Sequence, residues 1–165
     1  WRPRTPCCIA RHRQPGPDRV DPAVRGRTAC ASARMAGMNW IHLVAVLALL
    51  EYLAFTLLTG RARVQYKVRA PATSGHEMYE RAYRVQMNTL EQLLVFLPAL
   101  FLAGMYWPPA VVAAVGAVFL VGRLLYRFQY VKEPASRAPG FILSLLPNVV
   151  LLLASLVGVL RGVAA

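Results

Sequence analysis

The chain has 165 residues, of which 57% are hydrophobic, and its mean hydropathy is +0.43. A soluble domain of this length is normally more polar, so these values exclude an ordinary soluble enzyme and indicate a membrane protein. The formal net charge is +12. Residues 1–34 supply half of it with eight Arg and two Asp, and the rest of the chain supplies the other half with eleven Lys or Arg and five Glu.

Residues 1–34 contain five prolines and almost no apolar run, so we expect them to be disordered. A basic arm for nucleic acid or anionic lipid is one alternative, and an Arg-rich organelle transit segment is another. A third is that this stretch is not native, because the chain begins with Trp1 whereas Met35 or Met38 directly precedes the first apolar run. We favour a start at one of these methionines, treat 35–165 as the domain, and expect no nucleic-acid partner.

Four apolar segments follow, each long enough to cross a bilayer. We predict them at about 41–58, 77–105, 110–130 and 141–160. The prolines inside the second and fourth segments are tolerated in membrane helices. The even spacing predicts an all-α fold, namely an antiparallel bundle of four transmembrane helices joined by short loops. All cysteines precede residue 35, so neither a disulfide framework nor a cysteine metal site supports this domain, and we expect no metal.

The basic residues predict the orientation in the membrane. Four follow the first span, namely Arg61, Arg63, Lys67 and Arg69, and three flank the loop after the third span, namely Arg127, Lys132 and Arg137. The loop after the second span has none. The positive-inside rule therefore places the first and third loops in the cytosol and both termini outside. The arginines of residues 1–34 conflict with this orientation if they belong to the mature protein.

The start of the second span carries polar residues on one helical face. Arg81, Arg84, Asn88 and Glu91 follow the spacing i, i+3, i+7, i+10, which places them on the same side of a helix. A charged residue in a membrane costs roughly 3 kcal/mol on insertion scales, so it usually faces a protein interior or a wet cavity. Two guanidinium groups, an amide and a carboxylate suit a small zwitterionic ligand with carboxylates and an amine.

The end of the third span carries a second set. Arg123, Tyr126 and Tyr130 share a face, Arg127 lies one turn from Arg123, and Arg137 follows in the loop. Antiparallel neighbours would bring the cytosolic ends of spans two and three to the same level, which predicts a basic, tyrosine-bearing pocket at one membrane interface. The alternative is that arginines and tyrosines at helix ends extend to lipid headgroups, which applies most to Arg81, Arg127 and Lys132.

Three further polar residues leave two interpretations each. Glu51, in the middle of the first span, is either a buried structural partner for an Arg or Asn, or a catalyst. His76 and Glu77 either form a metal or acid–base pair, or belong to a helix start, where Glu is favoured by the helix dipole.

Together these residues resemble a known family. R-x-Q-x-N-x-x-E on the second span and G-R-x-x-Y-x-x-x-Y on the third resemble the MAPEG family, the membrane-associated proteins in eicosanoid and glutathione metabolism. The stretch A-R-V-Q-Y-K-V-R-A-P before the second span looks like the family's first cytosolic loop. The resemblance covers about residues 38–163.

The resemblance implies a glutathione site between two subunits of a homotrimer. Its glutathione-binding residues would be Arg63, Arg84, Gln86, Asn88, Glu91, Arg123, Tyr126 and Tyr130. Arg137 would be the catalytic residue, falling where family members carry the arginine that activates the thiol. One residue departs from the pattern: the residue after the motif glutamate is Gln92, where eicosanoid-making members often have Tyr, and this weakens any claim to leukotriene synthesis.

The function that the resemblance implies is a membrane-bound glutathione transferase or peroxidase. Glutathione is the co-substrate, and the partner substrates are apolar electrophiles or lipid hydroperoxides that arrive from the bilayer, as in detoxification. The membrane would be a bacterial inner membrane or of endoplasmic reticulum type, with the active site at the cytosolic face. The alternative is a non-catalytic lipid- or glutathione-binding protein of the same fold, because a fold does not fix a function.

Overall fold

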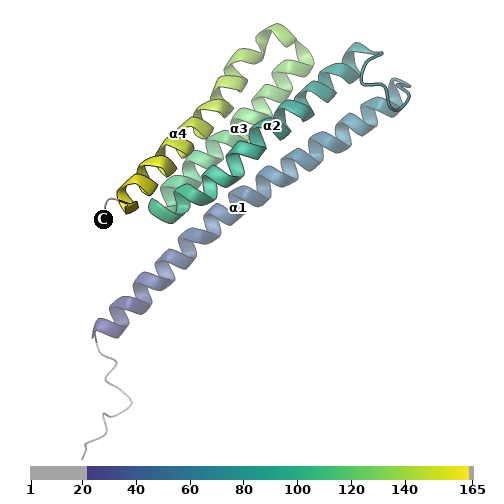
Figure 1. Cartoon of the computed structure of the whole chain (residues 1–165). Coiled ribbons are helices and arrows are strands. Elements are labelled where there is room, and N and C mark those ends of the chain that lie inside the picture. The colour runs from purple at the N-terminus through teal and green to yellow at the C-terminus, as the bar shows by residue number, and fades with distance from the viewer. Residues whose placement is uncertain (1–21, 164–165) are drawn as a thin grey trace, which may run out of the picture. The chain divides into compact units, whose positions relative to one another are not determined.

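The computed structural model describes the backbone of residues 22–163 and the side chains of residues 40–162, and residues 1–21 and 164–165 lie outside the described range. Its elements are α1 (Pro22–Gln65), α2 (Glu77–Tyr106), α3 (Pro109–Lys132), the short 3-10 helix η1 (Pro134–Arg137) and α4 (Ala138–Val163). The chain divides into two units, Trp1–Ala33 and Arg34–Ala165. The second unit contains the four helices that lie side by side in Figure 1, and its fold is described below.

Four helices are long and apolar enough to cross a membrane, which confirms the predicted all-α, four-span architecture. They comprise Trp40–Gln65, Glu77–Tyr106, Pro109–Lys132 and Pro134–Gly162. The first helix continues beyond the predicted end at residue 58, so Arg61 and Arg63 belong to the last turns of α1 and not to a loop. Basic side chains interact favourably with the carbonyl end of a helix, so a cluster of arginines does not end it.

The backbone of residues 22–34 is helical and forms the first part of α1, whereas we expected disorder over 1–34. Pro22 suits the first position of a helix because its missing N–H would be unpaired there anyway, and the alanines and arginines that follow are good helix formers. Residues 1–21 lie outside the described residues. Their disorder, and the non-native origin of 1–34, stay predictions.

The start of α2 resolves the two interpretations of His76 and Glu77. His76 is the N-cap residue, and its Nδ1 accepts a hydrogen bond from the backbone N–H of Met78 at 3.2 Å. Glu77 and Glu80 lie in the first turn, where a negative charge interacts favourably with the helix dipole. Both His76 and Glu77 therefore help to begin the helix, as the second interpretation had it.

The core lies where α1, α2, α3 and α4 meet. Phe96 of α2 and Phe119 of α3 are buried and stack at 3.9 Å between ring centroids. Two glycines allow α3 and α4 to approach closely: a Cβ at Gly122 would lie 2.7 Å from the backbone N of Ser144, and one at Gly140 would collide with the backbone of Tyr126. Small residues of this kind allow close helix packing in membranes, and here they hold the start of α4 against the end of α3.

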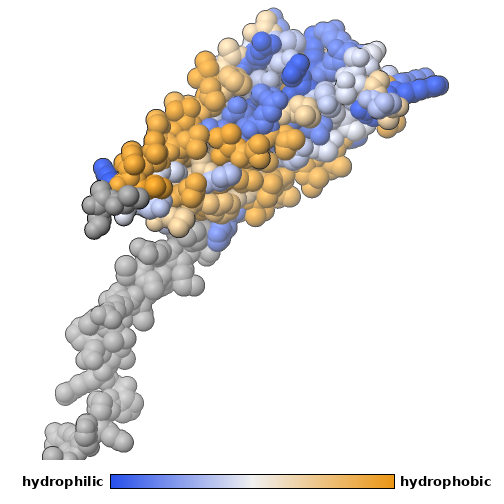
Figure 2. Space-filling view, in the orientation of Figure 1, coloured by the Kyte–Doolittle hydropathy of each residue, from blue (hydrophilic) through white to orange (hydrophobic). Residues whose placement is uncertain are grey.

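The surface of the second unit divides into apolar helix shafts and a polar end. Large apolar side chains such as Leu94, Val111 and Leu153 are more than half exposed along the shafts. Hydrophilic residues gather at one end in Figure 2, where Figure 1 shows the α1–α2 loop and the connection between α3 and α4. We call this region the polar end; it comprises residues 61–77 and 127–138. The division is that of an integral membrane protein whose shafts face lipid or another protomer.

Candidate functional site

A cavity of about 830 Å³ opens between α2, α3, η1 and the start of α4. Five of the nine predicted site residues line it, namely Arg84, Asn88, Tyr126, Tyr130 and Arg137. The rest of its wall is largely apolar and comprises Pro134, Ala135, Ala138, Phe141 and Ile142. The polar groups come from three separate elements, so the packing of α2 against α3 and η1 creates the site.

A second cavity of about 520 Å³ adjoins the first and shares Arg84, Tyr130 and Pro134 with it. Glu91, the last residue of the motif on α2, lines this second cavity. Its Oε2 accepts a hydrogen bond of 3.3 Å from the amide nitrogen of Asn88. The walls of the two adjoining cavities carry groups of the kinds that a zwitterionic peptide requires, namely three arginines, one amide and three carboxylates: Arg81, Arg84, Arg137, Asn88, Glu77, Glu80 and Glu91.

Arg123 lies behind the first cavity and is completely buried. Its Nη2 donates to Thr89 Oγ1 at 2.5 Å and its Nη1 donates to Asn88 Oδ1 at 3.0 Å. Its guanidinium carbon lies 4.5 Å from the ring centroid of Tyr126. Arg123 thus contacts two residues of the cavity wall, Asn88 and Tyr126, and the glutathione contact that the resemblance implies for it stays a prediction.

Arg137 is the last residue of η1 and not part of an irregular loop. It is exposed, lines the first cavity, and its guanidinium carbon lies 5.8 Å from the ring centroid of Tyr130. Its neighbours Ala135 and Ala138 line the same cavity, and their short side chains leave space beside the guanidinium group. Arg137 is therefore an accessible cation at the boundary between the polar and apolar parts of the cavity wall.

Arg63 and Gln86 lie elsewhere. Gln86 Nε2 donates to Thr56 Oγ1 of α1 at 3.3 Å. Arg63 donates to the hydroxyl group of Tyr79 and, at 2.9 Å, to the carbonyl oxygen of Ala72. Neither residue lines the two cavities. A single protomer therefore does not bring these two residues together with the other seven.

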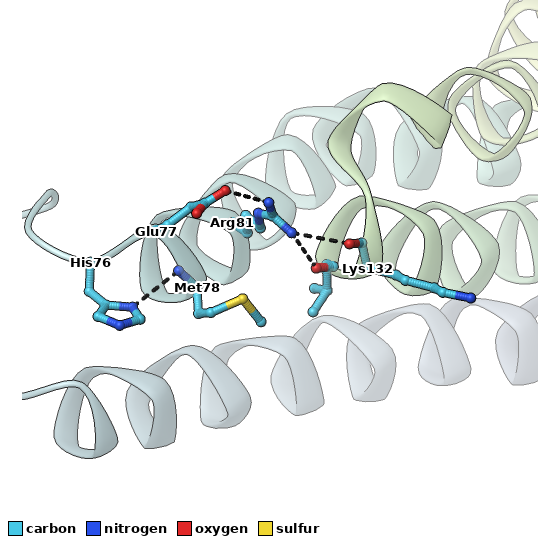
Figure 3. A network of polar contacts seen from close by, with 6 residues as sticks. His76, Glu77, Met78, Arg81 and Lys132 are labelled. Carbon is cyan, nitrogen blue, oxygen red and sulfur yellow. Dashed lines mark hydrogen bonds and ion pairs between the residues drawn. The ribbon is translucent and has the colours of Figure 1, made fainter.

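Arg81 connects the start of α2 to the end of α3 through hydrogen bonds, as Figure 3 shows. It forms an ion pair with Glu77 one turn earlier and donates to the carbonyl oxygens of Val131 at 2.9 Å and Lys132 at 3.2 Å. Its guanidinium group is thus engaged within the protein. All four residues of the helical face predicted at Arg81, Arg84, Asn88 and Glu91 line one or both of the two cavities, and Arg81 also holds the two helix ends together.

The two interpretations of Glu51, a structural partner or a catalyst, both stay open. It is half-buried, and its Oε1 has no hydrogen-bond partner among the described residues. Within residues 40–162 no group of three His, Cys, Asp or Glu side chains lies close enough to hold a metal ion.

Several residues that position the site were not predicted from the sequence. Thr89 and Ser144 supply hydroxyl acceptors to Arg123, with Ser144 Oγ at 3.4 Å. The sequence could have predicted such acceptors, because an arginine inside an apolar segment requires hydrogen-bond acceptors from neighbouring helices. Gln92, which departs from the family pattern, turns toward α4, where its Oε1 accepts a hydrogen bond of 2.7 Å from Asn148 Nδ2.

Comparisons with known proteins agree with this geometry. The family model described as the MAPEG family matches residues 41–157, a range that contains all nine predicted site residues. The chain is 44% identical over 121 residues to the uncharacterized protein sll1147 of Synechocystis sp., covering 73% of this chain and 88% of that protein. It is 36% identical over 102 residues to microsomal glutathione S-transferase 2 of Homo sapiens, covering 62% of this chain and 69% of that protein. It is also 36% identical over 94 residues to leukotriene C4 synthase of Cavia porcellus, covering 57% of this chain and 63% of that protein.

Proposed function

The chain belongs to the MAPEG family, and on this basis we propose that it is a membrane-bound glutathione transferase. The observation that carries the proposal is the 830 Å³ cavity, whose wall contains both polar and apolar side chains. A conjugation reaction between a water-soluble peptide and an apolar electrophile needs both kinds of wall, and it needs them at a membrane interface.

Each polar residue has a role in binding glutathione. Arg84 binds a carboxylate in a charge-assisted pair, Glu91 binds the amine, and Asn88 binds a peptide group. Tyr126 and Tyr130 line the wall behind the peptide. Arg123 is buried, so it contributes by holding Asn88 and by its positive charge.

Arg137 activates the thiol. A cysteine thiol has a pKa of roughly 8.5 and is a poor nucleophile until it ionises. A guanidinium group near the sulfur stabilises the thiolate and remains protonated at any working pH. The exposed position of Arg137 beside Tyr130, at the apolar edge of the cavity, fits this role.

The thiolate then attacks the second substrate. Its lone pair forms a bond to an electrophilic carbon, and the leaving group departs with the electron pair of the bond that breaks. With a lipid hydroperoxide the thiolate attacks a peroxide oxygen instead, and the O–O bond breaks. Two glutathione molecules are then oxidised to the disulfide while the hydroperoxide is reduced to an alcohol and water. Phe141 and Ile142 give the electrophile an apolar surface in the same cavity.

The site is completed by a second protomer of a homotrimer. Arg63 and Gln86 belong to the motif that resembles the family's, yet they contact Tyr79 and Thr56 away from the cavities. A neighbouring subunit could present its own Arg63 and Gln86 to this cavity. Burial of the apolar shafts and of polar groups between protomers also removes the cost of exposing such groups to lipid. The active site lies at the cytosolic face, because the polar end carries the basic residues.

The test is a conjugation assay. The full chain, purified in detergent, is mixed with glutathione and 1-chloro-2,4-dinitrobenzene, and formation of the conjugate is followed by absorbance. We expect protein-dependent turnover that Arg84→Ala and Arg137→Ala reduce and that Arg69→Ala, in the exposed α1–α2 loop, leaves unchanged. Binding of glutathione without turnover toward aryl halides, epoxides or hydroperoxides would favour the non-catalytic alternative. Absence of glutathione binding would contradict the transferase and would leave the lipid-binding form of that alternative.

A further inference from the structure

A third cavity, of about 290 Å³, lies among α1, α2 and α3 at the polar end. Arg61 and Arg127 line it together with apolar side chains, among them Phe55, Leu58, Val85 and Val131. It shares no lining residue with the two cavities of the glutathione site. It is therefore a separate place where cations and apolar groups meet.

Arg127 distinguishes this cavity from an ordinary basic helix end. Its side chain is half-buried, and its guanidinium carbon lies 5.2 Å from the ring centroid of Phe55. Within residues 40–162 it makes no hydrogen bond to an acceptor and no ion pair, whereas Arg63, Arg81 and Arg123 each donate to oxygen atoms. A partly buried guanidinium group that lacks an anionic partner is costly, unless a ligand supplies one.

The depth of the cavity in the membrane indicates which anion is available. Arg61 and Arg127 both lie about one turn from the ends of their helices, at Gln65 and Lys132. Both belong to the polar end defined above, where hydrophilic residues gather in Figure 2. The cations are therefore at the depth of lipid headgroups, and the apolar wall lies toward the bilayer core.

We propose that this cavity binds one membrane phospholipid with an anionic headgroup. The phosphate oxygens accept hydrogen bonds from Arg127 and Arg61, since guanidinium groups bind phosphate in a bidentate, charge-assisted way. The glycerol end of the acyl chains lies against Phe55, Leu58 and Val85. A headgroup with its own ammonium group is disfavoured, because that cation would lie near two arginines.

The chain provides a matched control for nonspecific attraction between arginine and headgroups. Arg161, near the end of α4, also lies over an aromatic ring, with its guanidinium carbon 5.5 Å from the ring centroid of Trp107. It lines none of the three cavities described above. Arg127 and Arg161 are thus both helix-end arginines that contact an aromatic ring, but Arg127 is half-buried in a cavity and Arg161 is exposed.

The experiment measures retained lipid by native mass spectrometry of the full chain after delipidation in detergent and addition of dioleoyl phosphatidylglycerol, dioleoyl phosphatidylcholine or inorganic phosphate. We expect one phosphatidylglycerol per protomer, bound roughly tenfold more tightly than phosphatidylcholine, as a charge-assisted contact to two arginines implies. Arg127→Gln should abolish this preference, Arg127→Lys should retain part of it, and Arg161→Gln should leave it unchanged. Glutathione conjugation should stay within twofold in all three variants.

Two results would overturn the proposal. Equal losses in Arg127→Gln and Arg161→Gln would show that both arginines attract headgroups nonspecifically. Inorganic phosphate that displaces phosphatidylglycerol, or equal binding of the two lipids, would show that the site does not select an anionic lipid. If Arg127→Gln fails to fold, Arg61→Gln serves as the second variant; it keeps the contact between Arg127 and Phe55 and should still weaken phosphatidylglycerol binding.

Discussion

The guanidinium group of Arg123, on α3, donates a hydrogen bond of 3.0 Å to the side-chain oxygen of Asn88, on α2. Arg123 is completely buried, whereas Asn88 lines the first cavity. Because the oxygen of Asn88 is taken by Arg123, its amide nitrogen points toward Glu91, with an N–O distance of 3.3 Å. The buried guanidinium group of Arg123 therefore sets the orientation of the Asn88 side-chain amide, so that its nitrogen and not its oxygen is available to the ligand.

Replacing Arg123 should therefore reduce both stability and affinity. Arg123→Met removes the donor to Asn88 and Thr89, and each buried acceptor left unsatisfied costs about 1–3 kcal/mol. We expect a clear fall in melting temperature in detergent together with weaker glutathione binding by calorimetry. Arg84→Met is the control: it should weaken binding with a much smaller change in melting temperature, since Arg84 lines the cavities. An Arg123→Met variant that keeps both properties would remove Arg123 from this network.

Loss of Arg84 should weaken glutathione binding strongly. Removing one partner of a desolvated ion pair costs on the order of 3–5 kcal/mol, so Arg84→Ala should raise the dissociation constant at least about a hundredfold. Calorimetric titration with glutathione measures this directly. Arg69→Ala, in the exposed α1–α2 loop, removes the same charge from the same end of the molecule and should leave the constant unchanged. A similar constant in both variants would place the ligand elsewhere.

If each site lies between two protomers, two variants that are each defective alone should complement each other in mixed trimers. Homotrimers of Arg63→Ala and of Arg84→Ala should each bind glutathione poorly, because every site in them lacks one arginine. Trimers assembled from both variants contain a site with an intact Arg84 from one protomer and an intact Arg63 from its neighbour. Co-expressed variants, separated by two affinity tags, should therefore regain part of the conjugation activity. A stable, active monomer in detergent, or no recovery in mixed trimers, would contradict this arrangement.

The orientation in the membrane can be tested with reporters. Fusions after Arg69 and after Trp107 should lie on opposite sides of the membrane, because α2 separates the two positions. The basic residues of the polar end predict that the Arg69 fusion is cytosolic. Equal cytosolic signals from both fusions would overturn the orientation and, with it, the access of glutathione from the cytosol.

The helices and much of the site could be predicted from the sequence because both follow from local patterns. Apolar length defines the four spans, and helical spacing places Arg84, Asn88 and Glu91 on the side of α2 that lines the two cavities. The helix ends were less certain, since Arg61 and Arg63 extend α1 when a hydropathy pattern suggests a loop.

What the sequence did not predict depends on contacts between helices. Helical spacing shows that Arg81 and Arg84 share a face, yet it does not show that Arg81 donates to the carbonyl oxygens of Val131 and Lys132, nor that Arg84 lines both cavities. Likewise the spacing of Arg123 and Tyr126 does not show which of the two lines the first cavity: both side chains are buried, and Tyr126 is the one in the cavity wall. Such differences arise from the crossing of α2 and α3, which is set by packing.

Arg137 is the residue proposed to activate the thiol. An electrostatic contact to sulfur acts mainly on reactivity and not on retention of the peptide. Arg137→Ala should therefore keep glutathione affinity within a few fold and lower turnover by roughly tenfold or more, as for the loss of one electrostatic stabiliser.

The most direct measurement is the thiolate absorbance of bound glutathione as a function of pH, in the wild-type protein and in Arg137→Ala. A cation beside the sulfur favours the thiolate, so the wild-type titration should lie below the ordinary thiol pKa of roughly 8.5, and the variant should shift back toward it. Arg127→Ala, at the third cavity, should titrate like the wild type. If Arg137→Ala binds glutathione and shows the wild-type thiolate signal and turnover, Arg137 only anchors the polar end, and the central claim fails.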